Sequence, residues 1–199
     1  MPFLFIISGQ RLGLDVTAAT APKHFLVKYK SEQYGWINLE ATSGANPARD
    51  VWIRKQEPMT DEALANGVYL QPLTRRETAA EMSTIVAESY LLQQKYEQAI
   101  AITDVILERY PKDVGTMIMK GVAYGRLSRQ RFDSRYSSPS EIPPEQRQYY
   151  QYLSANNHEW FSKAESLGWR EERPGDDTDY LKRVEQAKQR QTAGPAANN

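Results

Sequence analysis

Two short stretches of strand-forming residues, separated by a polar loop, constrain this chain more than any other feature. Residues 24–29 read His-Phe-Leu-Val-Lys-Tyr, residues 36–40 read Trp-Ile-Asn-Leu-Glu, and the loop from Lys30 to Gly35 joins them. Side chains alternate between the two faces of a strand, and β-branched and aromatic residues favour strands. We therefore predict an antiparallel hairpin over residues 24–40.

The faces of this hairpin follow from the register of pairing, because a slip of one residue would exchange them. One register gives a wholly apolar face, with Phe25 opposite Leu39 and Val27 opposite Ile37. The other face is mixed and carries His24, Leu26, Lys28, Trp36, Asn38 and Glu40. This register sets His24 opposite Glu40, and paired residues have Cβ atoms about 4.5–5.5 Å apart. A carboxylate at that distance can fix the tautomer of an imidazole.

A family resemblance rests on these residues. A strand that opens on His24, a turn, and then Trp36-x-x-Leu39-Glu40-x-Thr42 resembles the second half of the transglutaminase-like catalytic core. That core belongs to the papain-like cysteine protease superfamily and uses a Cys-His-Asp/Glu triad for acyl transfer. The resemblance matches His24 to the histidine of the triad and Glu40 to its acid.

The fuller similarity is to the bacterial SirB-type proteins, which join a transglutaminase-like core to tetratricopeptide (TPR) helices. It covers most of residues 1–169 and includes the stretch Asp61–Leu70. The resemblance implies an α+β fold. One departure is large: the sequence contains no cysteine, so the nucleophile of the triad is missing.

The composition narrows the classes of partner and cofactor. Lys plus Arg and Asp plus Glu number 25 each, so no net charge favours nucleic acid or an anionic membrane. The absence of cysteine excludes disulfides and thiolate metal sites, and it suits a cytoplasmic protein. Two histidines are too few for a histidine-built metal cluster. We expect no cofactor, no nucleic acid and no membrane association.

The start of the chain predicts a helix over Pro2–Leu12, which Gly13 ends. The run from Phe3 to Ile7 would make this helix apolar on all sides, which predicts that every face of the helix is buried. The run is too short for an export signal or a membrane span. In the family, this helix carries the nucleophile at its N-terminus, and the expected cysteine would fall just upstream of Met1. Two interpretations follow: a truncated start, which we favour, or a natural pseudoenzyme.

The second half of the sequence is helical. Thr74 and Glu77 form a predicted capping box, and TPR consensus positions are matched by Ala87, Tyr90, Tyr96, Ala99 and Pro111. We divide the chain into a transglutaminase-like core remnant at 1–57, a connector at 58–78 and TPR-like helices at 79–169. The helices carry an insertion at about 128–144, and residues 170–199 form a C-terminal helix and a disordered tail. That last helix is expected to begin at Thr178 and to end at Gln189.

Two functions fit this sequence. The first is the C-terminal portion of a cysteine-dependent acyl-transfer or peptidase-type enzyme, inactive in this chain, with His24 as general base and Glu40 orienting it. The second is a non-catalytic module whose TPR-like helices bind a protein or peptide. Four arginines could contact such a partner, although a run of this kind is more often a solvated loop: Arg126, Arg129, Arg131 and Arg135.

Overall fold

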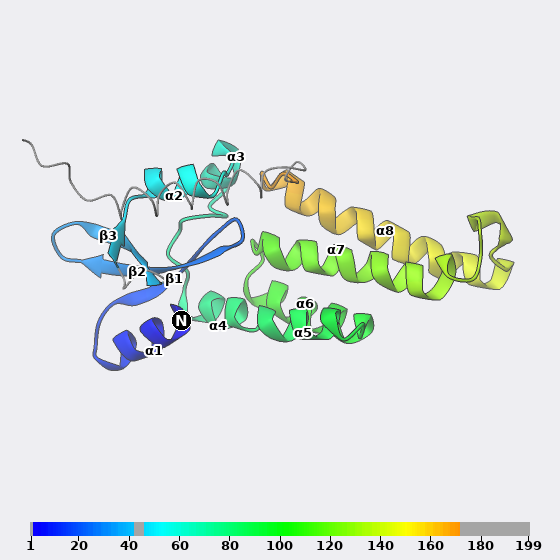
Figure 1. The fold of residues 1–199 in the computed structure, drawn as a ribbon, viewed down its shortest axis with the longest axis horizontal. Coiled ribbons are helices and arrows are strands. Elements are labelled where there is room, and N and C mark those ends of the chain that lie inside the picture. Colours follow the sequence, from blue (N-terminus) through cyan, green and yellow to red (C-terminus); the bar gives the residue numbers. More distant parts are fainter. Residues whose placement is uncertain (1, 42–45, 172–199) are drawn as a thin grey trace, which may run out of the picture.

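A computed structural model describes residues 2–41 and 46–171 of the chain. It has an α+β architecture, as predicted, with a small sheet at one end and long helices at the other (Figure 1). The strands lie within residues 16–48 and the long helices within residues 75–166. The predicted helix at 178–189, the tail and Thr42 lie outside the described residues.

Within the described residues, the sheet has four antiparallel strands in the order β1-β2-β3-β4. Strand β1 is Val16–Ala21, β2 is His24–Ser31, β3 is Gly35–Glu40 and β4 is Asn46–Ala48. The predicted hairpin is therefore present as β2 and β3. Pro22 and Lys23 make the turn between β1 and β2, and this turn lies at the end of the sheet that faces the helices (Figure 1). His24, the first residue of β2, lines a cleft together with residues of α4, α5 and α7.

The register of the hairpin differs from the predicted one by two residues. Leu39 pairs with Val27 instead of Phe25, and Ile37 pairs with Tyr29 instead of Val27. The turn sets this register: it is tighter than the predicted loop, and Gly35 closes it with a φ of +68°. Three-residue hairpin loops characteristically end on a residue with positive φ. A shift by two keeps every side chain on its predicted face.

Helix α1 (Pro2–Arg11) covers the apolar face of the sheet, where Ile6 packs with Ala18 and Val27. The prediction that this helix is buried on every side was wrong. Leu4 is 61% exposed and Ile7 is 43% exposed. A helix that lies on a sheet buries only the stripe that touches the sheet, and no other described element covers its remaining faces.

The mixed face of the sheet is covered by helix α2 (Asp50–Gln56), whose Ile53 is buried in one cluster with Leu26. Helix α3 (Asp61–Ala65) follows and is capped by Thr60, whose hydroxyl accepts a hydrogen bond from the Ala63 N–H at 3.0 Å. Gly67 then ends this turn with a φ of +69°.

The connector after α3 runs along the edge of the sheet. The Leu70 N–H donates to the Thr20 carbonyl at 2.9 Å, and the Leu73 N–H donates to the Ala18 carbonyl at 2.8 Å. These bonds satisfy part of the free edge of β1, as an added strand would. The connector is thus fixed to the sheet immediately before the helical half begins.

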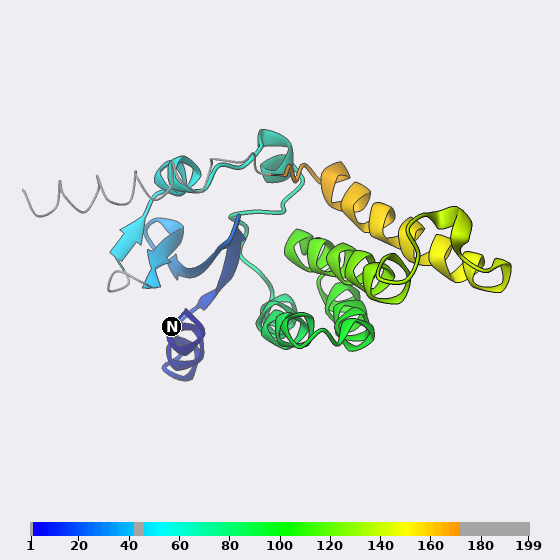
Figure 2. The ribbon, with the colours of Figure 1, turned by 45° about the vertical axis from the view of Figure 1, so that its right-hand side comes forward.

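The helical half contains α4 (Arg75–Met82), α5 (Thr84–Leu92), α6 (Tyr96–Arg109), α7 (Val114–Ser128) and α8 (Pro144–Ser166). The predicted capping box is present at the start of α4. The Glu77 N–H donates to the Thr74 hydroxyl, and the Glu77 carboxylate accepts from the Thr74 N–H at 2.8 Å. Figure 2 shows these helices packed as successive neighbours away from the sheet.

Residues 129–143, within the segment predicted to be an insertion, separate α7 from α8. This stretch holds a π-helical turn at Arg129–Asp133 and a 3-10 turn at Pro139–Glu141, after which α8 returns antiparallel to α7 (Figure 1). The two helices approach closely at Gly121, where an added Cβ would lie 2.9 Å from the Phe161 ring. No helix among the described residues is long and apolar enough to cross a bilayer.

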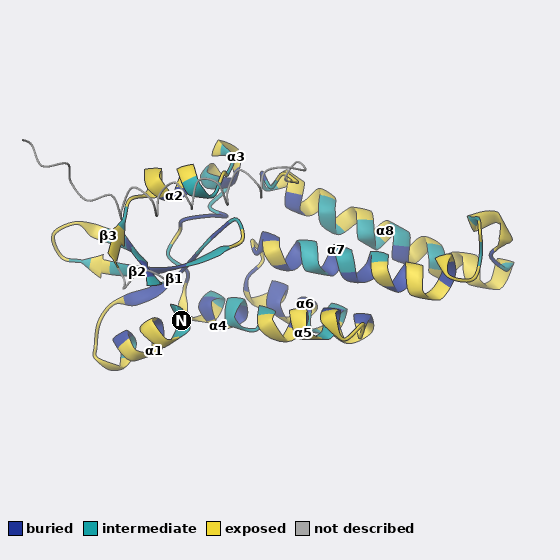
Figure 3. Cartoon of the chain, viewed as in Figure 1, coloured by how far each residue is buried: buried dark blue, intermediate teal, exposed yellow. Residues whose placement is uncertain are grey.

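The two halves share their buried clusters. One cluster joins Ile6 and Leu73 to Ala80 and Ile106 of the helices, and another joins Leu26 of β2 to residues of α7 and α8. Figure 3 shows buried positions on both sides of the junction between sheet and helices. The shared clusters indicate that the sheet and the helices pack as one structure.

Candidate functional site

The histidine and the acid of the family resemblance make contact in the structure. His24 Nε2 lies 2.9 Å from Glu40 Oε2 across β2 and β3. The residues are a diagonal pair and not the directly opposed pair that was predicted, because the register is shifted by two. Diagonal neighbours on one face remain within reach of long side chains. The His24 side chain is 26% exposed and that of Glu40 only 11%.

This contact determines which ring nitrogen of His24 is available for chemistry. An ionised carboxylate can only accept, so Nε2 carries the proton and its N–H donates a hydrogen bond to Glu40. The neutral ring then has its lone pair on Nδ1. No hydrogen bond to Nδ1 occurs within residues 2–41 and 46–171. The arrangement presents a proton acceptor that an acid holds in one orientation.

His24 lines a cleft of about 920 Å³ between the end of the sheet and the helices. Its walls come from Phe3 at the start of α1, the β1–β2 turn, α4 and α5, the start of α7, and Trp169 after α8. The rings of Phe3 and Phe25 are in edge contact, with centroids 4.6 Å apart. The first turn of α1 therefore lies at the same cleft as the imidazole.

Two acidic groups meet at the wall of this cleft, and no sequence pattern pointed to them. Glu81, at the end of α4, faces Asp113, the N-cap of α7. Burial, together with the Asp113 charge, raises the pKa of Glu81 to about 8. Burial also raises the pKa of Asp113, although two bonds from Thr116 favour its ionised form. Glu81 is therefore the group that holds a proton near neutral pH.

A second buried polar group supports the mixed face of the sheet. Lys28, 4% exposed, lies 3.9 Å from Asp50, and Asn38 donates to the same Asp50 oxygen at 2.6 Å. Burial lowers the pKa of Lys28, and Asp50 opposes that change. A charged residue in the middle of an apolar strand was the sequence signal for this pair. Its contacts are those of a structural ion pair beneath α2.

Among the described residues at the cleft, no side chain is activated as a nucleophile. The Thr20 hydroxyl donates to the Val68 carbonyl at 3.1 Å, and the Thr84 hydroxyl donates to the Glu81 carbonyl at 2.7 Å. Nucleophilic hydroxyls require a base within hydrogen-bond reach, which neither threonine has among the described residues. The described part of the cleft thus holds an imidazole in contact with a carboxylate but no activated hydroxyl.

The four arginines singled out in the sequence lie at the far end of the helices from the cleft. All are exposed: Arg126 in α7, Arg129 and Arg131 in the π-helical turn, and Arg135 in the loop that follows. Arg131 is paired with Glu97 of α6 at 2.9 Å. Their role in binding a partner stays a prediction.

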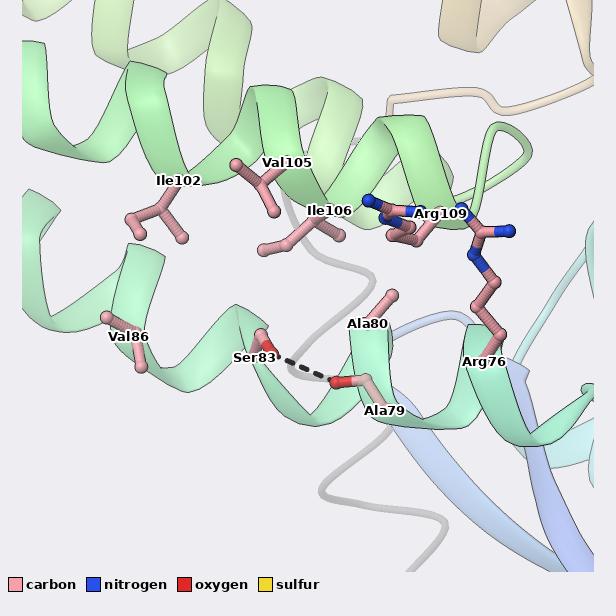
Figure 4. Close-up of a pocket in the computed structure, with 9 residues that line it drawn as sticks. All are labelled: Arg76, Ala79, Ala80, Ser83, Val86, Ile102, Val105, Ile106 and Arg109. Carbon is pink, nitrogen blue, oxygen red and sulfur yellow. Dashed lines mark hydrogen bonds between the residues drawn. The ribbon is translucent and has the colours of Figure 1, made fainter.

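A second hollow lies between the helices themselves. This groove, of about 510 Å³, is formed by α4 and α5 on one side and α6 on the other (Figure 4). Its lining is mainly aliphatic, with an arginine from α4 and another from α6: Arg76, Ala79, Ala80, Ser83, Val86, Ile102, Val105, Ile106 and Arg109. The sequence indicated helices here but not which of their faces remain open.

Comparison of this chain with family models, with curated proteins and with solved structures found no match.

Proposed function

We propose that His24 and Glu40 are the acid–base half of a transglutaminase-like acyl-transfer or amide-hydrolysis site. His24 acts as the general base through Nδ1, and Glu40 holds its tautomer and stabilises the imidazolium that forms. The observation that supports this most is the 2.9 Å contact from Nε2 to Glu40, made by an imidazole that lines a large cleft.

The position of α1 also supports the proposal. Unpaired N–H groups and the helix dipole at a helix N-terminus stabilise a thiolate, and α1 starts at this cleft. A thiol at that helix end would be activated both by the helix and by His24. Because the sequence holds no cysteine, the chain as given is expected to lack thiol-dependent activity.

The proposal is tested by supplying the thiol. Met1 is outside the described residues but directly precedes α1, so a Met1→Cys chain places a thiol at the helix end. We expect this chain to be acylated by a p-nitrophenyl ester, and His24→Ala in the same background to reduce that rate by roughly 10²–10⁴-fold. His158→Ala is the control for loss of an imidazole elsewhere. Equal acylation rates with and without His24 would refute the general-base role.

The groove between α4–α5 and α6 favours a second function. In this function the TPR-like helices bind a peptide. The aliphatic lining of the groove is open, with Val86 46% and Val105 56% exposed. Selection from a displayed library of amphipathic peptides would test it. Val105→Glu should abolish the enrichment, whereas Ile85→Glu, at a 57% exposed position outside the groove, should not. Enrichment that survives Val105→Glu would exclude this groove as the binding site.

A further inference from the structure

The groove between α4–α5 and α6 has a charged end as well as an apolar floor. Arg76 comes from the first turn of α4 and Arg109 from the last turn of α6. Figure 4 shows both side chains at the same end of the groove, with Val86 and Ile102 toward the other end. Each arginine is exposed.

These two cations are weakly compensated. Arg109 lies 3.2 Å from Glu108, its neighbour in the chain, and Arg76 has no ion pair within the described part of the molecule. Two guanidinium groups at one end of an apolar groove fit a ligand with negative charge at one end and apolar side chains after it. A ligand of this kind would lie with its negative end beside Arg76 and Arg109 and its apolar side chains toward Val86.

This chain contains a segment with that order of residues. Three acidic residues, Asp176, Asp177 and Asp179, come just before four apolar ones that share a helical face: Tyr180, Leu181, Val184 and Ala187. We propose that residues 176–187 bind in this groove as an amphipathic helix, with the aspartates beside Arg76 and Arg109 and the apolar face on Val86 and Val105. The inference is independent of the acyl-transfer proposal.

The lengths agree with this direction of binding. From Asp179 to Ala187 a helix rises about 12 Å, and Arg76 and Val86 are separated by a similar stretch of α4 and α5. Glu171, the last described residue, lies at the cleft on the other side of α4 and α5. Residues 172–179 can span up to about 26 Å, more than the width of a helix, about 10–12 Å.

The cleft is the competing location for the segment, and its charge opposes the aspartates. Glu88, Asp113 and Glu171 line it together with Lys23, and Glu81 there is neutral while it holds its proton. An acidic run placed there would meet further carboxylates, whereas in the groove it meets two arginines. Charge therefore distinguishes the two locations for the same segment.

The absence of cysteine makes a crosslinking test direct. The pair Val86→Cys with Ala187→Cys places one thiol in the groove and one on the apolar face of the segment. The matched control is Glu88→Cys with Ala187→Cys, whose first thiol lies on the cleft side of α5. In the full chain, under dilute oxidation followed by mass spectrometry, we expect the groove pair to form an intrachain disulfide at least about tenfold faster. Equal rates, a faster cleft pair or mainly interchain disulfides would each overturn the proposal.

Charge reversal provides a second test that does not depend on the introduced thiols fitting well. Arg76→Glu with Arg109→Glu changes only exposed side chains, so the fold should survive, and it should slow the groove disulfide about tenfold. Replacement of Asp176, Asp177 and Asp179 by lysine in that double mutant should restore the rate. Failure of either the loss or the rescue would contradict the predicted direction of binding.

Discussion

Glu81 and Asp113 present their carboxyl groups to each other where the end of α4 meets the start of α7, and burial raises the pKa of Glu81 to about 8. The folded state thus binds a proton here more tightly than the unfolded chain, in which the pKa of a glutamate is about 4.5. This stabilisation of the folded state is fully present below the pKa of Glu81 in the unfolded chain. It is lost as the pH rises through the pKa of Glu81 in the folded protein.

The contribution of this pair to the free energy of unfolding should therefore fall as the pH rises from about 4.5 to about 8. Glu81→Gln keeps a neutral group at all pH values, so we expect it to stabilise the protein at pH 8.5 by on the order of 2 kcal/mol. Urea unfolding at pH 5 and pH 8.5 measures the difference. Glu88→Gln, an exposed cleft position, is the control, and a Glu81→Gln effect independent of pH would contradict the assignment.

The tautomer of His24 is a second prediction. Because Nε2 donates to Glu40, ¹⁵N NMR of the neutral ring should show the proton on Nε2 and a bare Nδ1. Glu40→Gln should weaken this preference, since an amide can accept or donate at that position. The exposed His158 provides an internal reference in the same spectrum. A His24 ring protonated on Nδ1 would remove the geometric basis of the general-base role.

The shared clusters predict that the two ends of the molecule unfold together. Leu73 and Ile6 pack with Ala80 and Ile106, so neither the sheet nor the helices can bury these side chains alone. We expect one transition in urea for the whole chain, and a much less stable fragment when the chain starts at Leu73. A fragment with a cooperative transition at the midpoint of the parent would show instead that the helices are an independent domain.

The sequence predicted the faces of the hairpin but not its register. Faces depend on the parity of positions, so His24 and Glu40 share a face whether the strands slip by two or not. The register depends on the turn, and a polar run from Lys30 to Gly35 does not show which three residues form the loop. The contact between His24 and Glu40 survived the error because diagonal neighbours also touch.

Other features depended on tertiary partners that a local pattern cannot reveal. Capping at Thr60 and Thr74 was predictable, because each bond joins residues three positions apart. The exposed side of α1 was not predictable from the sequence, and neither was the pairing of Glu81 with Asp113. Each depends on which distant element packs against the residues concerned. The open groove was missed for the same reason: aliphatic spacing in α4 to α6 indicates helices without showing how closely they meet.

The most direct test of the central claim is the pKa of a thiol at the start of α1. In the Met1→Cys chain, the rate of alkylation by iodoacetamide as a function of pH reports the thiolate fraction. An ordinary cysteine has a pKa of about 8.5, and we predict a midpoint at least about one unit lower that returns toward 8.5 in His24→Ala but not in His158→Ala. A midpoint near 8.5 in Met1→Cys, or a lowered midpoint that His24→Ala leaves unchanged, would contradict the role of His24 as the base of an acyl-transfer site.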